Sequence, residues 1–177
     1  MIILRQTDFS DHSAIAELHA DSWKKNYRGI YSDQFLENEV DKDRLNVWFQ
    51  RLKSPVKNQL TTVAVLNNMI VGFSCVFIND DPVFGSLIDN LHVTTTLQKS
   101  GVGKMLLADC AASIIQKGDN KKMYLWVYDS NHNAKAFYER LGGTKFETIE
   151  KTNTDGTVAM SCRYIWNDTR IFVNFPS

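Results

Sequence analysis

Two glycines separated by one residue open a segment with helical spacing, directly after an apolar stretch rich in β-branched residues. The stretch is residues 87–94, and the loop that follows, residues 98–104, reads QKSGVGK. Glycines at the start of a helix let backbone N–H groups approach phosphate oxygens closely, and the helix dipole adds about half a positive charge there. The loop therefore predicts a site for a phosphate-containing ligand.

Three kinds of phosphate loop can be compared with these residues. A nucleoside triphosphate loop needs Gly where Gln98 stands and Ser or Thr where Met105 stands. A dinucleotide fingerprint needs a third glycine at the position of Leu106. The acyl-coenzyme A pattern, Q/R-x-x-G-x-G/A, is matched fully by Gln98, Gly101 and Gly103. A glycine turn that merely opens an ordinary helix is the structural alternative.

The elements that must position this loop follow from apolar periodicity. The predicted strands are 2–7, 63–66, 70–78, 87–94, 123–128, 144–152 and 158–166. The predicted helices are one capped by Ser10 or Asp11 and ended by Gly29, then 32–53, 102–117 and 133–141. Turns are expected at Asn67-Asn68 and at 153–156, and 79–82 is expected to be a loop. This order predicts a mostly antiparallel sheet around one β-α-β unit at 87–128, with helices on its faces.

Composition and charge exclude several classes of protein. The 177 residues are 44% hydrophobic and 23% charged, which suits one soluble domain with a real core. Lys plus Arg equals Asp plus Glu at 20 each, so the basic excess of a nucleic-acid-binding protein is absent. No apolar segment approaches the length of a membrane span, and the N-terminus MIILRQTDF is too short and polar for a signal peptide.

Cysteine and histidine usage points to a reducing compartment and away from a metal site. The three cysteines, Cys75, Cys110 and Cys162, are odd in number and widely spaced, which favours free thiols and a cytoplasmic location. The four histidines show no paired metal-ligand spacing. We expect no metal.

Two motifs resemble signatures of one known family. The strand at 87–93 with its glycine loop resembles motif A of the GNAT superfamily of N-acetyltransferases. About 33 residues after Gln98, the pattern Asn131-x-x-Ala134-x-x-Phe137-Tyr138-x-x-x-Gly142 is similar to the second GNAT signature. The stretch SWKKNYRGI, residues 22–30, is similar to a Trp-x-x-x-Tyr-Arg-Gly stretch of small stand-alone GNAT acetyltransferases of unassigned substrate, which often carry an Asp-Asn-Leu-His-Val strand.

The resemblance implies a fold and a domain organisation. The expected fold is α/β (α+β mixed): a predominantly antiparallel, mixed seven-stranded sheet with a central β-α-β unit, about four helices, and splayed fourth and fifth strands. The strand at 87–94 is expected to bulge near its centre. A single domain would span 1–177, with a helical acceptor-side region at 9–55 and an acetyl-CoA-binding core at 87–142.

The resemblance also implies a reaction, in which an acetyl group passes from acetyl-CoA to a primary amine by direct attack in a ternary complex. The N–H groups of 99–104 would face the pyrophosphate, and the backbone of Leu91 and Val93 would bond the pantetheine arm and the thioester carbonyl. The full set of implied cofactor-binding residues is Leu91, His92, Val93, Gln98, Lys99, Ser100, Gly101, Val102, Gly103, Lys104, Asn131, Ala134, Phe137 and Tyr138.

Asp89 and Tyr138 are the candidate catalytic residues. The resemblance places an acidic residue four positions before Val93, where Asp89 would take a proton from the amine, directly or through water. His92 is the rival base, with a suitable intrinsic pKa but on the strand face opposite Leu91. Tyr138 would protonate the departing CoA thiolate. In the structural alternatives, Asp89 is a carboxylate that pairs with a basic neighbour, and Tyr138 is a buried aromatic residue of a helix.

The acceptor site is expected at Trp23, Tyr27 and Arg28. Each of these residues also has a purely structural interpretation. Trp23 and Tyr27 could simply anchor the core, and Arg28 could simply be exposed. Likewise, Asn131 could cap a helix and Lys104 could be a solvated surface residue. The acceptor would be a small-molecule or peptide amine, with no nucleic acid and no membrane partner.

Two other functions stay open from the sequence. One is a non-catalytic acyl-CoA-binding or sensor domain on the same fold, and the other is a structural domain without a cofactor. The apolar tail at 167–177 is expected to pack on the sheet or across the partner of a homodimer.

Overall fold

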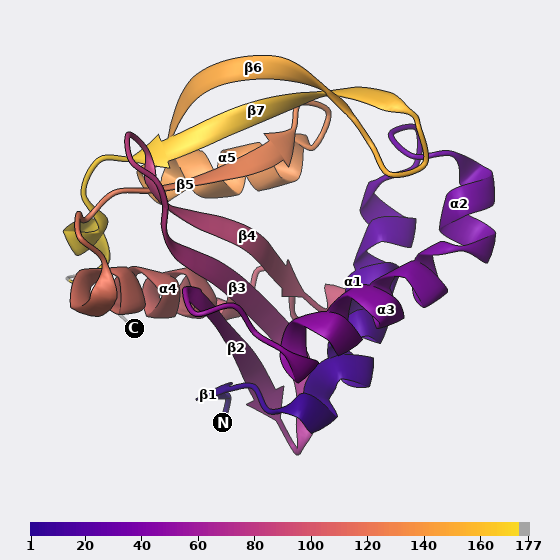
Figure 1. Ribbon diagram of the computed structural model, residues 1–177, viewed down its shortest axis with the longest axis horizontal. Coiled ribbons are helices and arrows are strands. Elements are labelled where there is room, and N and C mark those ends of the chain that lie inside the picture. The colour runs from indigo at the N-terminus through magenta and orange to yellow at the C-terminus, as the bar shows by residue number, and fades with distance from the viewer. Residues whose placement is uncertain (174–177) are drawn as a thin grey trace.

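The computed structural model describes residues 1–173 and builds them around one seven-stranded sheet in the order β1-β2-β3-β4-β5-β7-β6 (Figure 1). The strands are β1 (Ile3–Gln6), β2 (Gln59–Leu66), β3 (Met69–Asp81), β4 (Gly85–Val93), β5 (Met123–Tyr128), β6 (Thr144–Thr152) and β7 (Val158–Trp166). All neighbours are antiparallel except β4 and β5, which flank the β-α-β unit. The predicted mixed sheet is confirmed.

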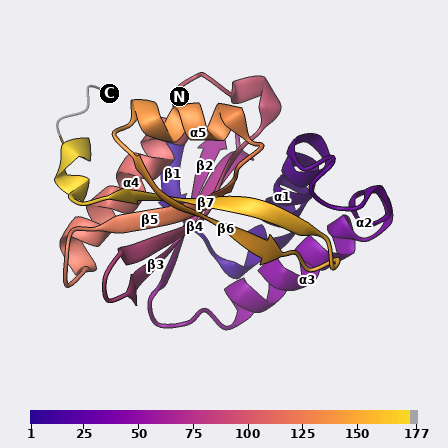
Figure 2. The ribbon, with the colours of Figure 1, turned by 90° about the horizontal axis from the view of Figure 1, so that it is seen from above.

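Helices cover both faces of the sheet, as Figure 2 shows from above. They are α1 (His12–Asn26), α2 (Asp33–Asn38), α3 (Val40–Lys53), α4 (Val102–Lys117) and α5 (His132–Arg140). Short 3-10 turns stand at Phe9–Asp11, Thr95–Leu97 and Thr169–Phe172. Helices α1 to α3 lie on one side, and α4 and α5 lie on the other. Within residues 1–173 no helix is long and apolar enough to cross a bilayer.

Most connections follow from the turn residues. Asn67 and Asn68 both have left-handed backbone, with φ of 49° and 63°, and they close the β2–β3 hairpin as expected. Gly29 has a φ of 77° in the turn after α1, although the helix already ends at Asn26. Asp11 occupies the N-terminal cap position of α1, as expected, but its side chain makes no capping hydrogen bond there, and Asp8 caps the preceding 3-10 turn through its side chain.

Two expected boundaries were wrong. The helix expected over 32–53 is two helices, α2 and α3, because Glu39 leaves helical geometry with φ −122° and ψ −31°. This raises the helix number from about four to five within the described residues. The expected loop at 79–82 also differs, because β3 continues to Asp81 past Asn79, whose φ is 54°, and Asp81 pairs with Gly85. Asn79 bends the strand without ending it.

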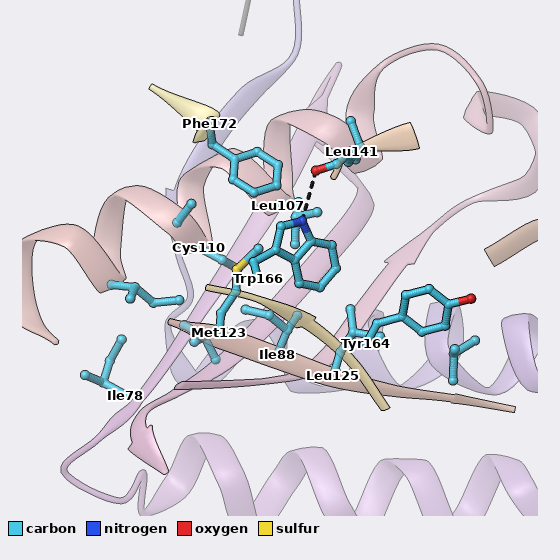
Figure 3. Close-up of a cluster of buried hydrophobic side chains, with 14 of the residues drawn as sticks. Ile78, Ile88, Leu107, Cys110, Met123, Leu125, Leu141, Tyr164, Trp166 and Phe172 are labelled. Carbon is cyan, nitrogen blue, oxygen red and sulfur yellow. Dashed lines mark hydrogen bonds between the residues drawn. The ribbon is translucent and has the colours of Figure 1, made fainter. Parts of the chain in front are cut away.

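The larger core cluster lies under α4 and holds β5 and β7 to it (Figure 3). Trp166 fills its centre and donates a hydrogen bond from Nε1 to the carbonyl oxygen of Leu141 over 2.9 Å. Phe172, 5% exposed, packs on the same cluster, whereas its apolar neighbours Ile171 and Val173 are exposed. Residues 174–177, including Phe175 of the expected apolar tail, lie outside the described residues. Cys75, Cys110 and Cys162 are buried free thiols.

Strand β4 carries the two irregularities that shape the site. Cys75 pairs with Asn90 and Val76 pairs with Ile88, so Asp89 is the extra residue of a β-bulge. On its other edge β4 pairs with β5 only at Ser86–Met123 and Leu87–Tyr124. Beyond these pairs the two strands diverge toward α1 and α3 (Figure 1). The expected bulge and splay are confirmed.

Candidate active site

The glycine loop forms the start of α4 and leaves backbone donors without helical partners. Gly101 is the N-terminal cap residue with a φ of 94°, and Lys99 also has left-handed backbone at 65°. The first N–H groups of any α-helix have no intrahelical acceptor. Gln98, Lys99 and Ser100 are exposed, so this end of α4 is open to an anionic ligand.

Gly103 lets three elements meet at this point. A Cβ atom on Gly103 would lie 3.3 Å from Cζ of Phe137 on α5 and 3.8 Å from Cγ2 of Val93 on β4. The first of these distances is tighter than most Cβ contacts, so a larger residue would force the Phe137 ring to shift. The two sequence motifs, far apart along the chain, are therefore joined in space at Gly103.

The remaining residues of the two motifs divide between packing and open positions. Val102 is fully buried, and Ala134, Phe137 and Tyr138 pack, half-buried, against the cluster under α4. Asn131 caps α5, since its Oδ1 accepts a hydrogen bond from the N–H of Ala134 over 3.2 Å. The capping alternative for Asn131 is thus present in the structure.

The splay leaves one edge of β4 available. Leu91 and Val93 direct half-buried side chains into core clusters and pair through β3 on one edge only. Among the described residues, no strand pairs with β4 on the β5 side after Leu87. Strand-edge N–H and C=O groups in this position need a partner, and an amide-bearing chain can supply it.

A cavity of about 160 Å³ lies on the α1 side of the splay. Its walls are His19, Trp23, Tyr27, Asp89, Asn90, His92, Trp126, Tyr128, Lys151 and Ser161. Asp89 and His92 both reach it although they are three positions apart, because the bulge at Asp89 shifts the alternation of β4. The expected base and its rival therefore share one chamber.

Asp89 is held by two donors that converge on one oxygen. The Arg51 guanidinium donates to Oδ2 over 2.6 Å, and the Asn90 amide donates to the same atom over 2.5 Å. Within residues 1–173, Oδ1 accepts no hydrogen bond and stays available. The structural alternative for Asp89, a pairing with a basic neighbour, is therefore present. The partner, Arg51 on α3, is not marked by any motif in the sequence.

His92 lies in a cluster of rings with His19 of α1. The ring centroids are 4.4 Å apart, and Nδ1 of His92 lies 2.8 Å from Oγ of Ser22. Burial, aided by the Arg44 charge, lowers the pKa of His92 to about 4, and burial also lowers the pKa of His19 well below its ordinary value. Both rings are therefore neutral at neutral pH, and His92 is chemically able to accept a proton only weakly.

The tautomer of His19 follows from its partner. Nε1 of Trp48 donates to Nδ1 of His19 over 2.9 Å, and an indole nitrogen can only donate. The neutral ring of His19 therefore carries its proton on Nε2. His19 was visible in the sequence only as a position on the inner face of α1.

Tyr138 stands on the α5 side of the sheet and does not line the cavity. Its hydroxyl makes no hydrogen bond to another described residue. Burial raises the pKa of Tyr138 above its ordinary value, with Tyr27 and Cys110 adding to the effect. The phenol stays protonated at neutral pH, as a proton donor must, but it gives up that proton less readily than free tyrosine.

The expected acceptor residues separate into two groups. Trp23 and Tyr27 line the cavity and also pack with Tyr31, with ring centroids 4.8 Å and 6.0 Å away. Arg28 is exposed and pairs with Asp33 and Glu37 at 2.8 Å and 3.0 Å. It does not line the cavity.

Lys151 of β6 is a wall residue that sequence reasoning missed. Its ammonium lies 3.8 Å from the centroid of the Trp126 ring. Burial lowers the pKa of Lys151, with Arg163 adding to the effect. The sequence does not distinguish a lysine that faces a cavity from one that faces solvent on an edge strand, because most lysines at such positions face solvent.

A larger groove of about 680 Å³ runs on the other side of α1. Its second wall is formed by the β2–β3 turn, by Val93 at the end of β4, and by the segment that follows, including Gln98. Ser22 lines this groove, and its hydrogen bond to His92 connects the groove wall to the cavity wall.

Known proteins share this sequence pattern and this architecture. The family model described as Acetyltransferase (GNAT) family matches residues 14–143. The "Uncharacterized N-acetyltransferase YuaI" of Bacillus subtilis is 27% identical over 153 residues, which cover 83% of this chain and 86% of YuaI.

Two solved structures have the same fold at low sequence identity. PaiA N-acetyltransferase from Thermoplasma acidophilum, solved in complex with coenzyme A, is 21% identical with a TM-score of 0.70, covering 91% of this chain and 98% of PaiA. NAA60 of Arabidopsis thaliana, solved with a bisubstrate analogue, is 18% identical with a TM-score of 0.71, covering 94% and 98% of the two chains. With the family model spanning most of the described residues, the chain belongs to the GNAT family and is an acetyl-CoA-dependent acyltransferase.

Proposed function

We propose that this acetyltransferase moves the acetyl group of acetyl-CoA to a primary amine by direct attack within a ternary complex. The observation that carries the proposal is the divergence of β4 and β5 after two paired positions, directly ahead of the glycine-opened start of α4. That arrangement offers an unpaired strand edge and a cluster of helix N–H groups in one line. A chain of amides ending in a pyrophosphate complements both.

The residues at the site fit acetyl-CoA, which supplies an acetyl group activated as a thioester. The backbone N–H groups of 99–104 bind the pyrophosphate, and Gly103 keeps the helix start close to Phe137 and Val93. The free edge of Leu91 and Val93 bonds the pantetheine amides, with the N–H of Val93 at the thioester carbonyl. The amide nitrogen of Asn131 is left for the same arm, since its oxygen caps α5.

The proposed chemistry uses groups on both sides of the splay. The amine nitrogen forms a bond to the acetyl carbon while the carbon–sulfur bond breaks. The proton lost by the amine goes to Oδ1 of Asp89, directly or through a water molecule, and the leaving sulfur takes a proton from Tyr138. Oδ1 of Asp89 faces the cavity without a hydrogen-bond partner among residues 1–173, whereas Nδ1 of His92 is already engaged with Ser22, and this difference supports Asp89 as the acceptor-side residue.

Within one proposed domain, one part of the site binds the acceptor and the other binds acetyl-CoA. The helical region at 9–55 contributes Trp23 and Tyr27 on the acceptor side, and the core at 87–142 contributes β4, α4 and α5 on the acetyl-CoA side. The cavity between them is the place where an amine meets the thioester.

The test combines a binding and a turnover measurement on the full chain. Acetyl-CoA should raise the thermal unfolding temperature, because a ligand of the native state stabilises it. With acetyl-CoA and a panel of amines, thiol release should exceed the rate without an amine. A thermal shift without any amine-dependent thiol release would favour the non-catalytic acyl-CoA-binding domain, and the absence of both would contradict the proposed function.

A further inference from the structure

The cavity next to the splay has two ionic walls of opposite sign. On β4, Asp89 keeps Oδ1 free, because Arg51 and Asn90 both donate to Oδ2. On β6, Lys151 holds a half-buried ammonium at the same cavity. Lys151 forms no ion pair with any residue in the described range 1–173. The Asp89 carboxylate across the same cavity attracts this ammonium but offsets only part of the cost of its burial, so the wall favours a further anionic group from outside the chain.

The surroundings of Lys151 add to this preference. The Arg163 guanidinium lies 4.5 Å from the centroid of the Trp126 ring, which the Lys151 ammonium also contacts at 3.8 Å. Arg163 has Glu147 as its counter-ion at 2.8 Å, whereas Lys151 shares the ring with a like charge. An anion bound at Lys151 would reduce this repulsion.

The rest of the cavity limits what can enter. Its volume is about 160 Å³, and aromatic rings from α1 and β5 form much of the wall. This space suits a small organic molecule with a short apolar middle.

We propose that the acceptor is a small amino acid, whose amine meets Asp89 while its carboxylate binds Lys151. This inference rests on the proposed acetyl transfer and specifies the substrate class at the same site. The amine end is then placed next to the splay where the thioester lies, and the carboxylate end fixes the orientation. Lys151 is a specificity residue in this arrangement, because it selects the acceptor without touching the reacting atoms.

The experiment uses matched pairs of an amino acid and its carboxamide, such as 4-aminobutyrate and 4-aminobutyramide, or alanine and alaninamide. Each pair keeps the size and the position of the amine and removes the negative charge, and rates are compared for the unprotonated amine of each compound. With acetyl-CoA and the wild-type protein, we expect kcat/KM for the acid to exceed that for the amide by about tenfold to a hundredfold, the scale of one charge-assisted hydrogen bond.

Three variants assign that preference to Lys151. Lys151→Met should bring the ratio of acid to amide close to one, and Lys151→Arg should keep most of it. Lys145→Met is the matched control, because Lys145 lies on the same strand, approaches Asp129 at 3.6 Å and does not line the cavity. Equal turnover of acid and amide by the wild-type protein, or a preference that persists in Lys151→Met, would overturn the proposal.

A binding measurement separates this proposal from the proposed function. If neither compound of a pair releases CoA, thermal unfolding is measured with the CoA-loaded protein. Stabilisation by the acid and not the amide, lost in Lys151→Met, would support the carboxylate site and contradict acetyl transfer to these amines. No stabilisation by any of the acids would overturn the carboxylate site, even where CoA itself binds.

Discussion

Asp89 and His92 lie three residues apart on one strand and yet face the same cavity. Regular alternation would send two residues with this spacing to opposite faces of the sheet. The bulge at Asp89 removes the conflict, and Arg51 and Asn90 then fix the carboxylate from one side. The position of the cavity's carboxylate is therefore set by backbone register as much as by residue type.

Replacing Asp89 by Asn should slow acetyl transfer while acetyl-CoA still binds. The amide cannot take up a proton, so turnover should fall by about a hundredfold or more, and most at lower pH, where the amine acceptor is protonated. The measurement is the pH profile of kcat with the best amine of a panel, beside the thermal shift with CoA. Asp119→Asn, at an exposed position, serves as the control. An equal loss at every pH would instead assign Asp89 a structural role with Arg51.

Tyr138→Phe should affect turnover more than stability. The ring that packs against Phe137 and Trp166 is retained. The hydroxyl has no hydrogen-bond partner among residues 1–173, so its removal breaks no hydrogen bond that stabilises the fold. Because a thiolate is already a fair leaving group, we expect kcat to fall by about tenfold to a few hundredfold. Affinity for acetyl-CoA should change by less than about 1 kcal/mol. Steady-state kinetics and CoA titration check this, and unchanged kcat with weaker binding would make the hydroxyl a binding contact.

Gly103→Glu should abolish the response to CoA. Its side chain would start 3.3 Å from Phe137 and would bring a negative charge to the helix end that is open to an anion. We expect the CoA-induced rise in unfolding temperature to disappear in a folded variant. Gly103→Ala separates the steric from the electrostatic contribution, and should lose only part of the rise. A full thermal shift in folded Gly103→Glu would remove the loop from the CoA site.

Stability should fall as the pH drops below the ordinary pKa of histidine. His92 in the folded chain binds a proton only near pH 4, whereas the unfolded chain binds it near pH 6.5. The contribution of neutral His92 to the free energy of unfolding is therefore fully present above pH 6.5, and it is lost as the pH falls from 6.5 toward 4. His92→Gln should reduce the slope by up to about 1.4 kcal/mol per pH unit. Urea unfolding between pH 4.5 and 7.5 measures it, with exposed His132→Gln as the control, and an unchanged slope would contradict the burial of a neutral ring.

Trp48→Phe should destabilise the fold by about 1–3 kcal/mol through the lost hydrogen bond alone. His19 is 2% exposed, so its Nδ1 would find no water to replace the indole donor. Trp126→Phe makes the same change of ring size at a half-buried tryptophan whose indole nitrogen has no partner among the described residues, and should cost less. Urea unfolding of both variants gives the comparison, and equal losses would mean that ring volume decides the effect.

Much of the fold could be predicted because its turns have strong local chemistry. The left-handed asparagines at Asn67 and Asn68 and the glycine cap at Gly101 fix their connections almost independently of the rest of the chain. The break at Glu39 could not be predicted, since no glycine or proline marks it and apolar spacing continues across it from Leu36 to Val40.

The cavity side of the site was harder to predict than the loop. Arg51, His19 and Lys151 come from three elements far apart in the chain, and each has an ordinary sequence context. Their meeting depends on the bulge, on the packing of α1 against α3, and on the placement of β7 between β5 and β6. Such long-range placement leaves no trace in local periodicity, whereas motif spacing was enough to propose Asp89 and Tyr138 as catalytic residues.

The two paired positions between β4 and β5 also divide the molecule mechanically. Ser86–Met123 and Leu87–Tyr124 are the only ladder contacts between the β1–β4 half and the β5–β7 half within residues 1–173. We expect a sheet joined by two residue pairs to flex at this junction, and we expect the amide hydrogens of the open edge to exchange with solvent without global unfolding. A ligand that bonds to that edge would act as an eighth strand. The sheet would then be stiff as a whole only when the ligand is bound.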